Sequence, residues 1–218
     1  MIYFLSCEGE TERWYFEWLK KQINNDPRTK NKVDFRFRKL MPSAFAKSNA
    51  GTFLKDMLNG SIFCRIQDIE DYNDEHIKKF HLLLKSTKEA RQRYKKISFT
   101  IGYSNFTFEV WILAHKAKVK EICDRAHYYQ QINSAYNTTF VNNDDYKHEY
   151  NFKNLLGQLT LDDVIHKAIP ECKRFVKKCY CDNPELKREL YGFKYIQANP
   201  DTTLHDFVQK ILEYAGLI

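Results

Sequence analysis

The sequence lacks the features that mark membrane and secreted proteins. Its 218 residues contain no run near the roughly 20 apolar residues that a membrane span needs. Met1 leads directly into a short apolar run that stops at an acid, so no secretory signal is expected. The six cysteines have no framework spacing, which indicates reduced thiols. These absences predict a cytoplasmic protein without a membrane association.

The chain also has few residues that interrupt helices and strands. It contains seven glycines and five prolines, and neither a repeat nor a Pro/Gly-rich linker divides it. His166, Cys172, Cys179 and Cys181 do not follow the paired spacing of common zinc sites. A chain of this length accommodates one domain with a full core, or one domain with an extension.

Charge is abundant but unevenly distributed. Lys and Arg number 35 and Asp and Glu 28, which gives a net charge of +7. Acids cluster at 8–12 and 68–74, whereas bases cluster at 36–39, 85–96 and 167–178. Acid clusters in a basic chain suit an enzyme in which cations meet a phosphate backbone. Ordinary surface charge is the alternative explanation of the same pattern.

The first 120 residues alternate strand-like and helical patterns. We expect strands at 2–7, 33–40, 61–67 and 97–102, and helices at 11–23, 46–58, 74–94 and 106–118. Thr11 is the expected N-cap of the first helix. This alternation predicts an α/β fold in which a mostly parallel, four-stranded sheet is covered by helices on both faces.

The pattern changes after about residue 120. Helices are expected at 126–132, 162–178 and 204–214, the last with Thr203 as its cap, and 133–150 is expected to be irregular. We therefore predict a core over residues 1–120 and a mainly helical extension over 121–218, packed together as a single structural unit.

The expected strand ends carry acids. The stretch "SCEGETERWYF" places Glu8, Glu10 and Glu12 directly after the first strand. Further polar residues follow the third and fourth strands: Asp68, Glu70, Asp71, Ser104, Asn105 and, at the start of the next helix, Glu109. Parallel strands joined by right-handed crossovers end at one edge of the sheet, where ligands of open α/β folds bind. We expect these side chains to converge there.

Converging carboxylates predict a divalent metal. Mg²⁺ takes oxygen ligands and retains several waters, so two or three carboxylates on adjacent strands can fix it. Glu8 and Glu12 are four residues apart and face one side of the helix if it begins at once. Without a cation these acids repel one another. Metal-assisted phosphoryl transfer is the chemistry that needs such an arrangement.

Several motifs resemble known families. Glu-Gly after a first strand and a D-x-D-like pair after a third resemble Toprim domains. More closely, "CEGETERWYFEWL", "DIEDYN", "YSNFTFEVWILAH" and "ANPDTTLHDFVQKIL" occur in the order found in the RloB-like family of bacterial proteins. The resemblance extends from Cys7 to Leu212. It implies a Toprim-like nuclease fold and a role in abortive infection or another anti-phage system, often beside an ABC- or AAA-like ATPase.

The resemblance also implies residue roles. Glu8 would be the general acid/base or first metal ligand, with Glu12 beside it, and Asp68 and Glu70 would hold Mg²⁺, for which Mn²⁺ can substitute. Glu109 would complete a second-metal or orienting shell. RNA such as tRNA, or DNA, is the implied substrate.

Two positions depart from the family pattern. The second acid of the pair is Glu70, for which Asp71 can substitute by a small twist, and "SNP" is replaced by "SNF". A catalytically silent subunit that binds nucleic acid or senses phage is therefore the alternative. The late lysine of OLD-type nucleases has no clear counterpart; Lys194 is a guess.

Nucleic-acid contacts are expected from basic and polar residues near the same edge. The residues expected to make them are Arg36, Arg38, Lys39, Ser104 and Asn105. The aromatic side chains of 128–150 could stack on unpaired bases or form a homodimer contact, and the sequence does not decide between these. His115 lies at helical spacing from Phe108 and Trp111, which favours a buried structural histidine over a metal ligand.

Overall fold

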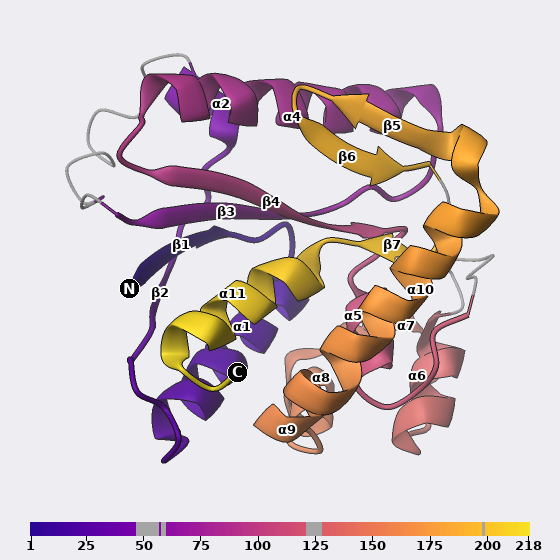
Figure 1. Ribbon diagram of the computed structural model, residues 1–218. Coiled ribbons are helices and arrows are strands. Elements are labelled where there is room, and N and C mark those ends of the chain that lie inside the picture. Colours follow the sequence, from indigo (N-terminus) through magenta and orange to yellow (C-terminus); the bar gives the residue numbers. More distant parts are fainter. Residues whose placement is uncertain (47–56, 58–59, 121–127, 198) are drawn as a thin grey trace.

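A mostly parallel sheet forms the centre of the computed structural model, which describes residues 1–46, 57, 60–120, 128–197 and 199–218 (Figure 1). Strands β1 (Ile2–Ser6), β2 (Asp34–Phe37), β3 (Ile62–Asp68) and β4 (Ser98–Asn105) are parallel, in the order β2-β1-β3-β4. β7 (Asp201–Thr202) adds an antiparallel fifth strand beside β4. The α/β prediction is confirmed, whereas the expected strand number was too low by this short strand.

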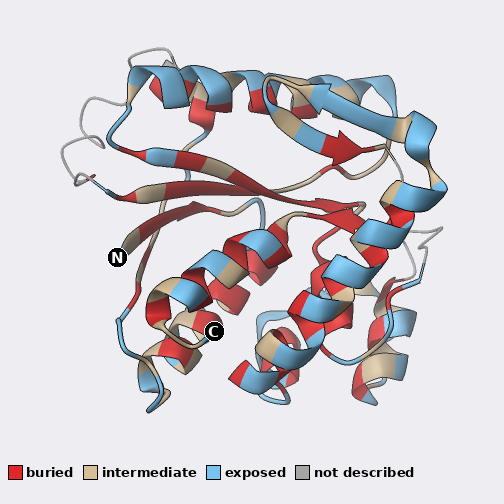
Figure 2. Cartoon of the chain, in the orientation of Figure 1, coloured by how far each residue is buried: buried red, intermediate tan, exposed pale blue. Residues whose placement is uncertain are grey.

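Helices cover both faces of the sheet, and Figure 2 shows its strands largely buried between them. On one face α1 (Glu10–Asn25) and α11 (Leu204–Ala215) pack against Tyr3 and Leu5. On the other, α2 (Pro42–Ala46) and α4 (Asp74–Arg93) lie over the sheet, and Phe4 packs against Phe45 there. The side-chain alternation of β1 thus separates two apolar layers. Most of the helix expected at 46–58 lies outside the described residues.

Short helices replace the irregular segment expected at 133–150. The second half contains α5 (Glu109–Ala114), α6 (Tyr128–Tyr136), α7 (Asn143–Lys147), α8 (Glu149–Leu156), α9 (Leu161–Asp163), a π-helical turn (Val164–Ala168) and α10 (Ile169–Asp182). Asn142 caps α7 by accepting the amide hydrogen of Asp145 at 2.8 Å. Such capped helices of five to nine residues are too short to give a clear apolar period.

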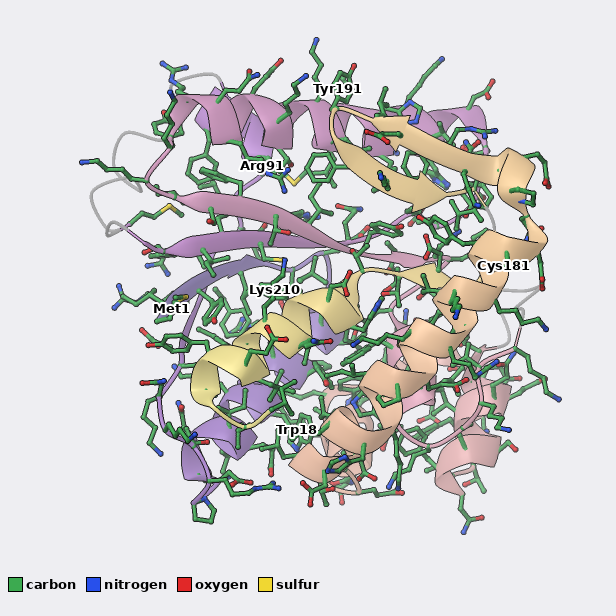
Figure 3. All side chains as sticks on the ribbon, in the orientation of Figure 1. Met1, Trp18, Arg91, Cys181, Tyr191 and Lys210 are labelled. Atoms are coloured by element: carbon green, nitrogen blue, oxygen red, sulfur yellow. The ribbon has the colours of Figure 1, made fainter. Side chains whose placement is uncertain are left out.

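A hairpin that the sequence analysis missed packs over α4. It comprises β5 (Lys187–Leu190) and β6 (Phe193–Ile196), and both turn residues, Tyr191 and Gly192, have positive φ. Arg91 belongs to α4, and its side chain points toward the sheet (Figure 3). Its Nε donates to the Phe99 carbonyl at 2.7 Å, and its guanidinium lies 4.3 Å from the centre of the Phe193 ring.

The C-terminal helix packs against the N-terminal part of the chain. α11 packs on the face that also carries α1, and the Phe207 and Tyr3 rings are 6.1 Å apart. The Met1 amino group donates to the Tyr214 hydroxyl at 2.7 Å, and the Lys30 amide to the Ala215 carbonyl at 2.8 Å. Both ends of the chain therefore belong to one apolar layer.

The cap expected for α1 is wrong, whereas the one expected for α11 is right in position but makes no capping hydrogen bond. Gly9, not Thr11, precedes the first residue of α1. Thr203 precedes α11, but its hydroxyl donates to the Ile101 carbonyl at 3.2 Å and caps no helical amide. At α11 a tertiary contact takes the place of the local one, whereas at α1 the local cap lies two residues earlier and is formed by Gly9 and Glu12.

Candidate active site

Glu8 and Asp68 meet at the carboxyl edge of the sheet. The Asp68 amide donates to a Glu8 carboxylate oxygen at 2.8 Å, and the Gln67 side-chain amide donates to the same oxygen at 2.6 Å. β1 and β3 are adjacent and parallel, so their ends bring the two residues together. The predicted convergence of the first and third strand ends is present.

Glu12 faces the same region from the first turn of α1. Its carboxylate accepts the Gly9 amide hydrogen at 3.1 Å and the Thr11 hydroxyl hydrogen at 3.2 Å, and its side chain is buried. Because Glu12 caps the start of its own helix, its side chain folds back toward Gly9 and Glu8.

Burial and neighbouring acids raise the pKa values of Asp68 and Glu12. Burial raises the pKa of Asp68 well above its ordinary value, and the carboxylates of Glu12, Glu109 and Glu8 raise it further. Burial also raises the pKa of Glu12, to which Glu109 and Glu8 add. Four acids from β1, α1, β3 and α5 thus share one small region, where a bound proton or cation relieves their repulsion.

A lysine that the sequence analysis did not single out completes this region. Lys147 of α7 lies with its Nζ 3.2 Å from a Glu109 carboxylate oxygen, and the Thr107 hydroxyl donates to the other oxygen. Burial alone would lower the pKa of Lys147, but Glu109, Asp68 and Glu12 together outweigh it and the pKa is raised. Lys194, the earlier guess, is exposed on the β5–β6 hairpin near Glu189. The sequence did not indicate a role for Lys147, because the segment 133–150 has no apolar periodicity from which its helix could be predicted.

Glu70 and Asp71 make a different contact from the expected one. Their carboxylates lie 2.7 Å from Nε2 and Nδ1 of His76, respectively. Glu70 has a φ of 68°, so the chain leaves β3 in a left-handed conformation and the alternation expected after Asp68 ends. The second acid of the pair therefore lies against a histidine.

Glu8 and Asp68 fit a weakly caged Mg²⁺ better than a fully enclosed one. Within the described ranges, no three Asp, Glu, His or Cys side chains are grouped to hold a metal ion. Mg²⁺ needs only one or two carboxylates, since waters and substrate oxygens complete its shell. Glu8 and Asp68 supply such donors, and the repulsion that raises the Asp68 pKa favours a cation.

A buried arginine orients Glu8 through Gln67. Nη1 of Arg65 donates to the carbonyls of Ser6 and Cys7 at 3.3 and 2.9 Å. Nε and Nη2 of Arg65 donate to the Gln67 side-chain oxygen at 3.0 and 2.7 Å. The fork fixes the Gln67 amide, whose nitrogen then donates to Glu8.

The residues expected to contact nucleic acid fall into two groups. Lys39 is exposed, and Arg36 and Arg38 are half-buried with their guanidinium groups over the Phe4 ring. Ser104 and Asn105 are buried, and the Ser104 hydroxyl lies 3.2 Å from that of Thr202. The Ser104 side chain thus packs at the β4–β7 junction, and the nucleic-acid contact of Ser104 and Asn105 stays a prediction.

Most of the other aromatic and histidine candidates belong to the core. Tyr128, Tyr136 and Tyr146 are buried, whereas Tyr150 is exposed. His115 is buried; its Nδ1 lies 2.8 Å from the Trp111 carbonyl oxygen and its Nε2 3.1 Å from the hydroxyl of Tyr15. It has the structural role that its spacing predicted.

Two cavities meet at the acids. The smaller has a volume of about 250 Å³ and is lined by Glu8, Glu12, Asp68 and Lys147, among others. The larger has a volume of about 500 Å³, extends along α4 and shares Glu8, Asp68 and Glu70 with the first. The acids therefore face open space on two sides.

The fold and the site define an α/β protein with an acidic site at the carboxyl edge of a mostly parallel sheet. The model of a family described as RloB-like protein matches residues 3–211, and the chain belongs to this family. Searches of curated proteins and of solved structures found no significant match. In the described part of the chain, no helix has the length and apolar character needed to cross a membrane.

Proposed function

We propose that the protein is a metal-dependent nuclease of the Toprim type, which cleaves phosphodiester bonds in RNA such as tRNA, or in DNA. The observation that carries the proposal is the contact between Glu8 and Asp68, whose carboxylates lie at adjacent strand ends beside Glu12. Mg²⁺, or Mn²⁺ in its place, would lower the pKa of an attacking water and neutralise charge on the phosphate.

Each residue of the region has a role in this proposal. Glu8 and Asp68 hold the metal, and Gln67 keeps Glu8 oriented. Glu12 has a raised pKa, so it can accept or release a proton nearer neutral pH than an ordinary glutamate. Lys147 brings a positive charge toward the phosphate, and Glu109 holds its ammonium group in place.

The proposed biological role is that of an effector in a bacterial anti-phage or abortive-infection system. It rests on the family resemblance, and so does the expected control by an ABC- or AAA-like ATPase of the same locus. A homodimer is a further predicted state. Purification of the tagged protein from its native host would test the partner, and recovery without any ATPase would contradict that part of the proposal.

A catalytically silent, nucleic-acid-binding or phage-sensing subunit is the second candidate. Two contacts favour it: Glu109 lies against Lys147, and Glu70 lies against His76. Carboxylates with such partners carry less uncompensated charge, which weakens the attraction for a cation. The two candidates differ in whether a metal binds between Glu8 and Asp68.

Cleavage by purified variants tests the proposal. Wild-type protein is incubated with tRNA, single-stranded RNA, plasmid and single-stranded DNA in Mg²⁺ or Mn²⁺, and Glu8→Ala and Asp68→Ala are each expected to lower cleavage at least about a hundredfold. Glu213→Ala on α11 is the matched control and should cleave like wild type. Equal cleavage by both site variants would refute the assignment. Absence of anomalous density between Glu8 and Asp68 in Mn²⁺-soaked crystals would favour the silent subunit.

A further inference from the structure

The larger cavity has an apolar part that plays no role in the proposed cleavage. Its volume is about 500 Å³, and one end of it is formed by Glu8, Asp68 and Glu70. Away from the acids, its walls become mainly apolar and include Met41, Pro42, Ile69, Phe80, Leu82 and Leu83. This volume lies within the range of roughly 300–1,000 Å³ that small-molecule sites occupy.

One stripe of α4 faces this cavity without serving the core. The buried residues of α4 are Phe80, Leu83, Leu84, Thr87 and Ala90. Lys79, Leu82 and Ser86 also line the cavity and follow one another at helical spacing, and Leu82 is 62% exposed. The stripe therefore presents a cation, an apolar side chain and a hydroxyl in sequence along the cavity.

Met41 supplies a second exposed apolar side chain to the lining of this cavity. It is 42% exposed, and it precedes α2, whose first residues Pro42 and Ser43 also line the cavity. Large apolar side chains that line one cavity and are left open to solvent mark a ligand surface more than a packing defect. The ligand needs a flat or apolar part for this surface and a polar part that reaches the acids.

We propose that this cavity binds one unpaired nucleotide of the nucleic-acid strand that is cleaved. The base would pack between Met41 and Leu82, the Ser43 and Ser86 hydroxyls would face its polar edge, and the attached phosphate would extend to Glu8 and Asp68. A paired base is held inside a duplex and cannot enter such a pocket, so the cavity selects single strands, loops or flipped-out nucleotides. This inference rests on the proposed nuclease function, because it adds the substrate class to the same site.

Binding in Ca²⁺ tests the inference separately from cleavage, because a bound cation offsets the charge of Glu8 and Asp68 toward the phosphate and only binding is measured. Fluorescein-labelled ten-nucleotide RNA and DNA strands, alone or annealed to their complements, are titrated with the full chain in Ca²⁺ and followed by fluorescence anisotropy. The single strands are expected to bind at least about tenfold more tightly than the duplexes. Leu82→Ser and Met41→Ser are each expected to weaken single-strand binding about fivefold. Both positions are exposed, and thermal melting verifies the fold of each variant.

Ile218→Ser is the matched control, since Ile218 is also an exposed apolar residue but lies at the end of the chain, outside this cavity. It should bind like wild type. Duplexes that bind as tightly as single strands, or wild-type affinity in both cavity variants, would overturn the inference. If the binding pattern holds but no substrate is cleaved in Mg²⁺, the nuclease proposal fails and the nucleotide pocket stands. If paired and unpaired strands are cleaved equally well, and both cavity variants cleave like wild type, the nucleotide pocket fails and the nuclease proposal stands.

Discussion

Because Asp201 is buried, we expect one contribution to the stability of the protein to fall as the pH rises. It is buried in β7, where it accepts hydrogen bonds from the Tyr103 hydroxyl at 2.5 Å and from the Thr202 amide at 3.0 Å. Burial raises its pKa from 3.8 to about 7. Between these two values the folded protein keeps a proton that the unfolded chain releases, so the free energy of unfolding falls as the pH rises.

The size of this effect follows from the pKa difference. At about 1.4 kcal/mol for each pH unit, the full contribution is about 4 kcal/mol. It is present below pH 3.8 and lost as the pH rises through about 7. Between pH 5 and pH 8, wild type should therefore lose about 3 kcal/mol that Asp201→Asn does not lose.

Urea denaturation at several pH values measures this difference. Other groups titrate in the same range, but they are common to both proteins and cancel in the comparison. Asp74→Asn is the control, because Asp74 is an exposed acid on α4 that is not among the groups acting on the Asp201 pKa, and its removal should leave the full slope. The reasoning would be refuted if Asp201→Asn and wild type had parallel curves, or if wild type gained stability relative to the variant as the pH rose.

Two further substitutions test contacts around the sheet. Gln67→Met removes the acceptor of the Arg65 fork and a donor to Glu8. We expect it to lower the free energy of unfolding by about 1–3 kcal/mol and to raise the Mg²⁺ concentration needed for half-maximal cleavage, and an unchanged metal titration would contradict the orienting role. Gly102→Ala would place a Cβ 2.7 Å from Cδ2 of Leu204. Overpacking should cost about 1–3 kcal/mol, and an unchanged melting temperature would contradict this.

The sequence made the strands and the acid pair predictable. β1 and β3 are apolar runs with clear limits, whereas β4 continues to Asn105, three residues past its expected end. The crossover rule puts the strand ends at one edge, and the pairing of β1 with β3 brings Glu8 next to Asp68. Local patterns are strong for these elements because both faces of the sheet are buried.

Other features depend on tertiary contacts that leave no local pattern. β7 is two residues long and exists only because β4 pairs with it. Lys147 reaches Glu109 from a short helix in a polar segment. The left-handed backbone of Glu70 gave no signal, since non-glycine residues seldom adopt it. The burial of Ser104 likewise follows from β7 and not from its own neighbours.

The pairing of Met1 with Tyr214 and of Lys30 with Ala215 has a consequence for biosynthesis. The segment that forms β1 leaves the ribosome long before the segment that forms α11, so the part of the sheet face that α11 covers stays open during most of translation. Folding of this layer can therefore be completed only after α11 has been made, and truncated products that lack α11 would leave its apolar contacts, such as Tyr3 with Phe207, exposed.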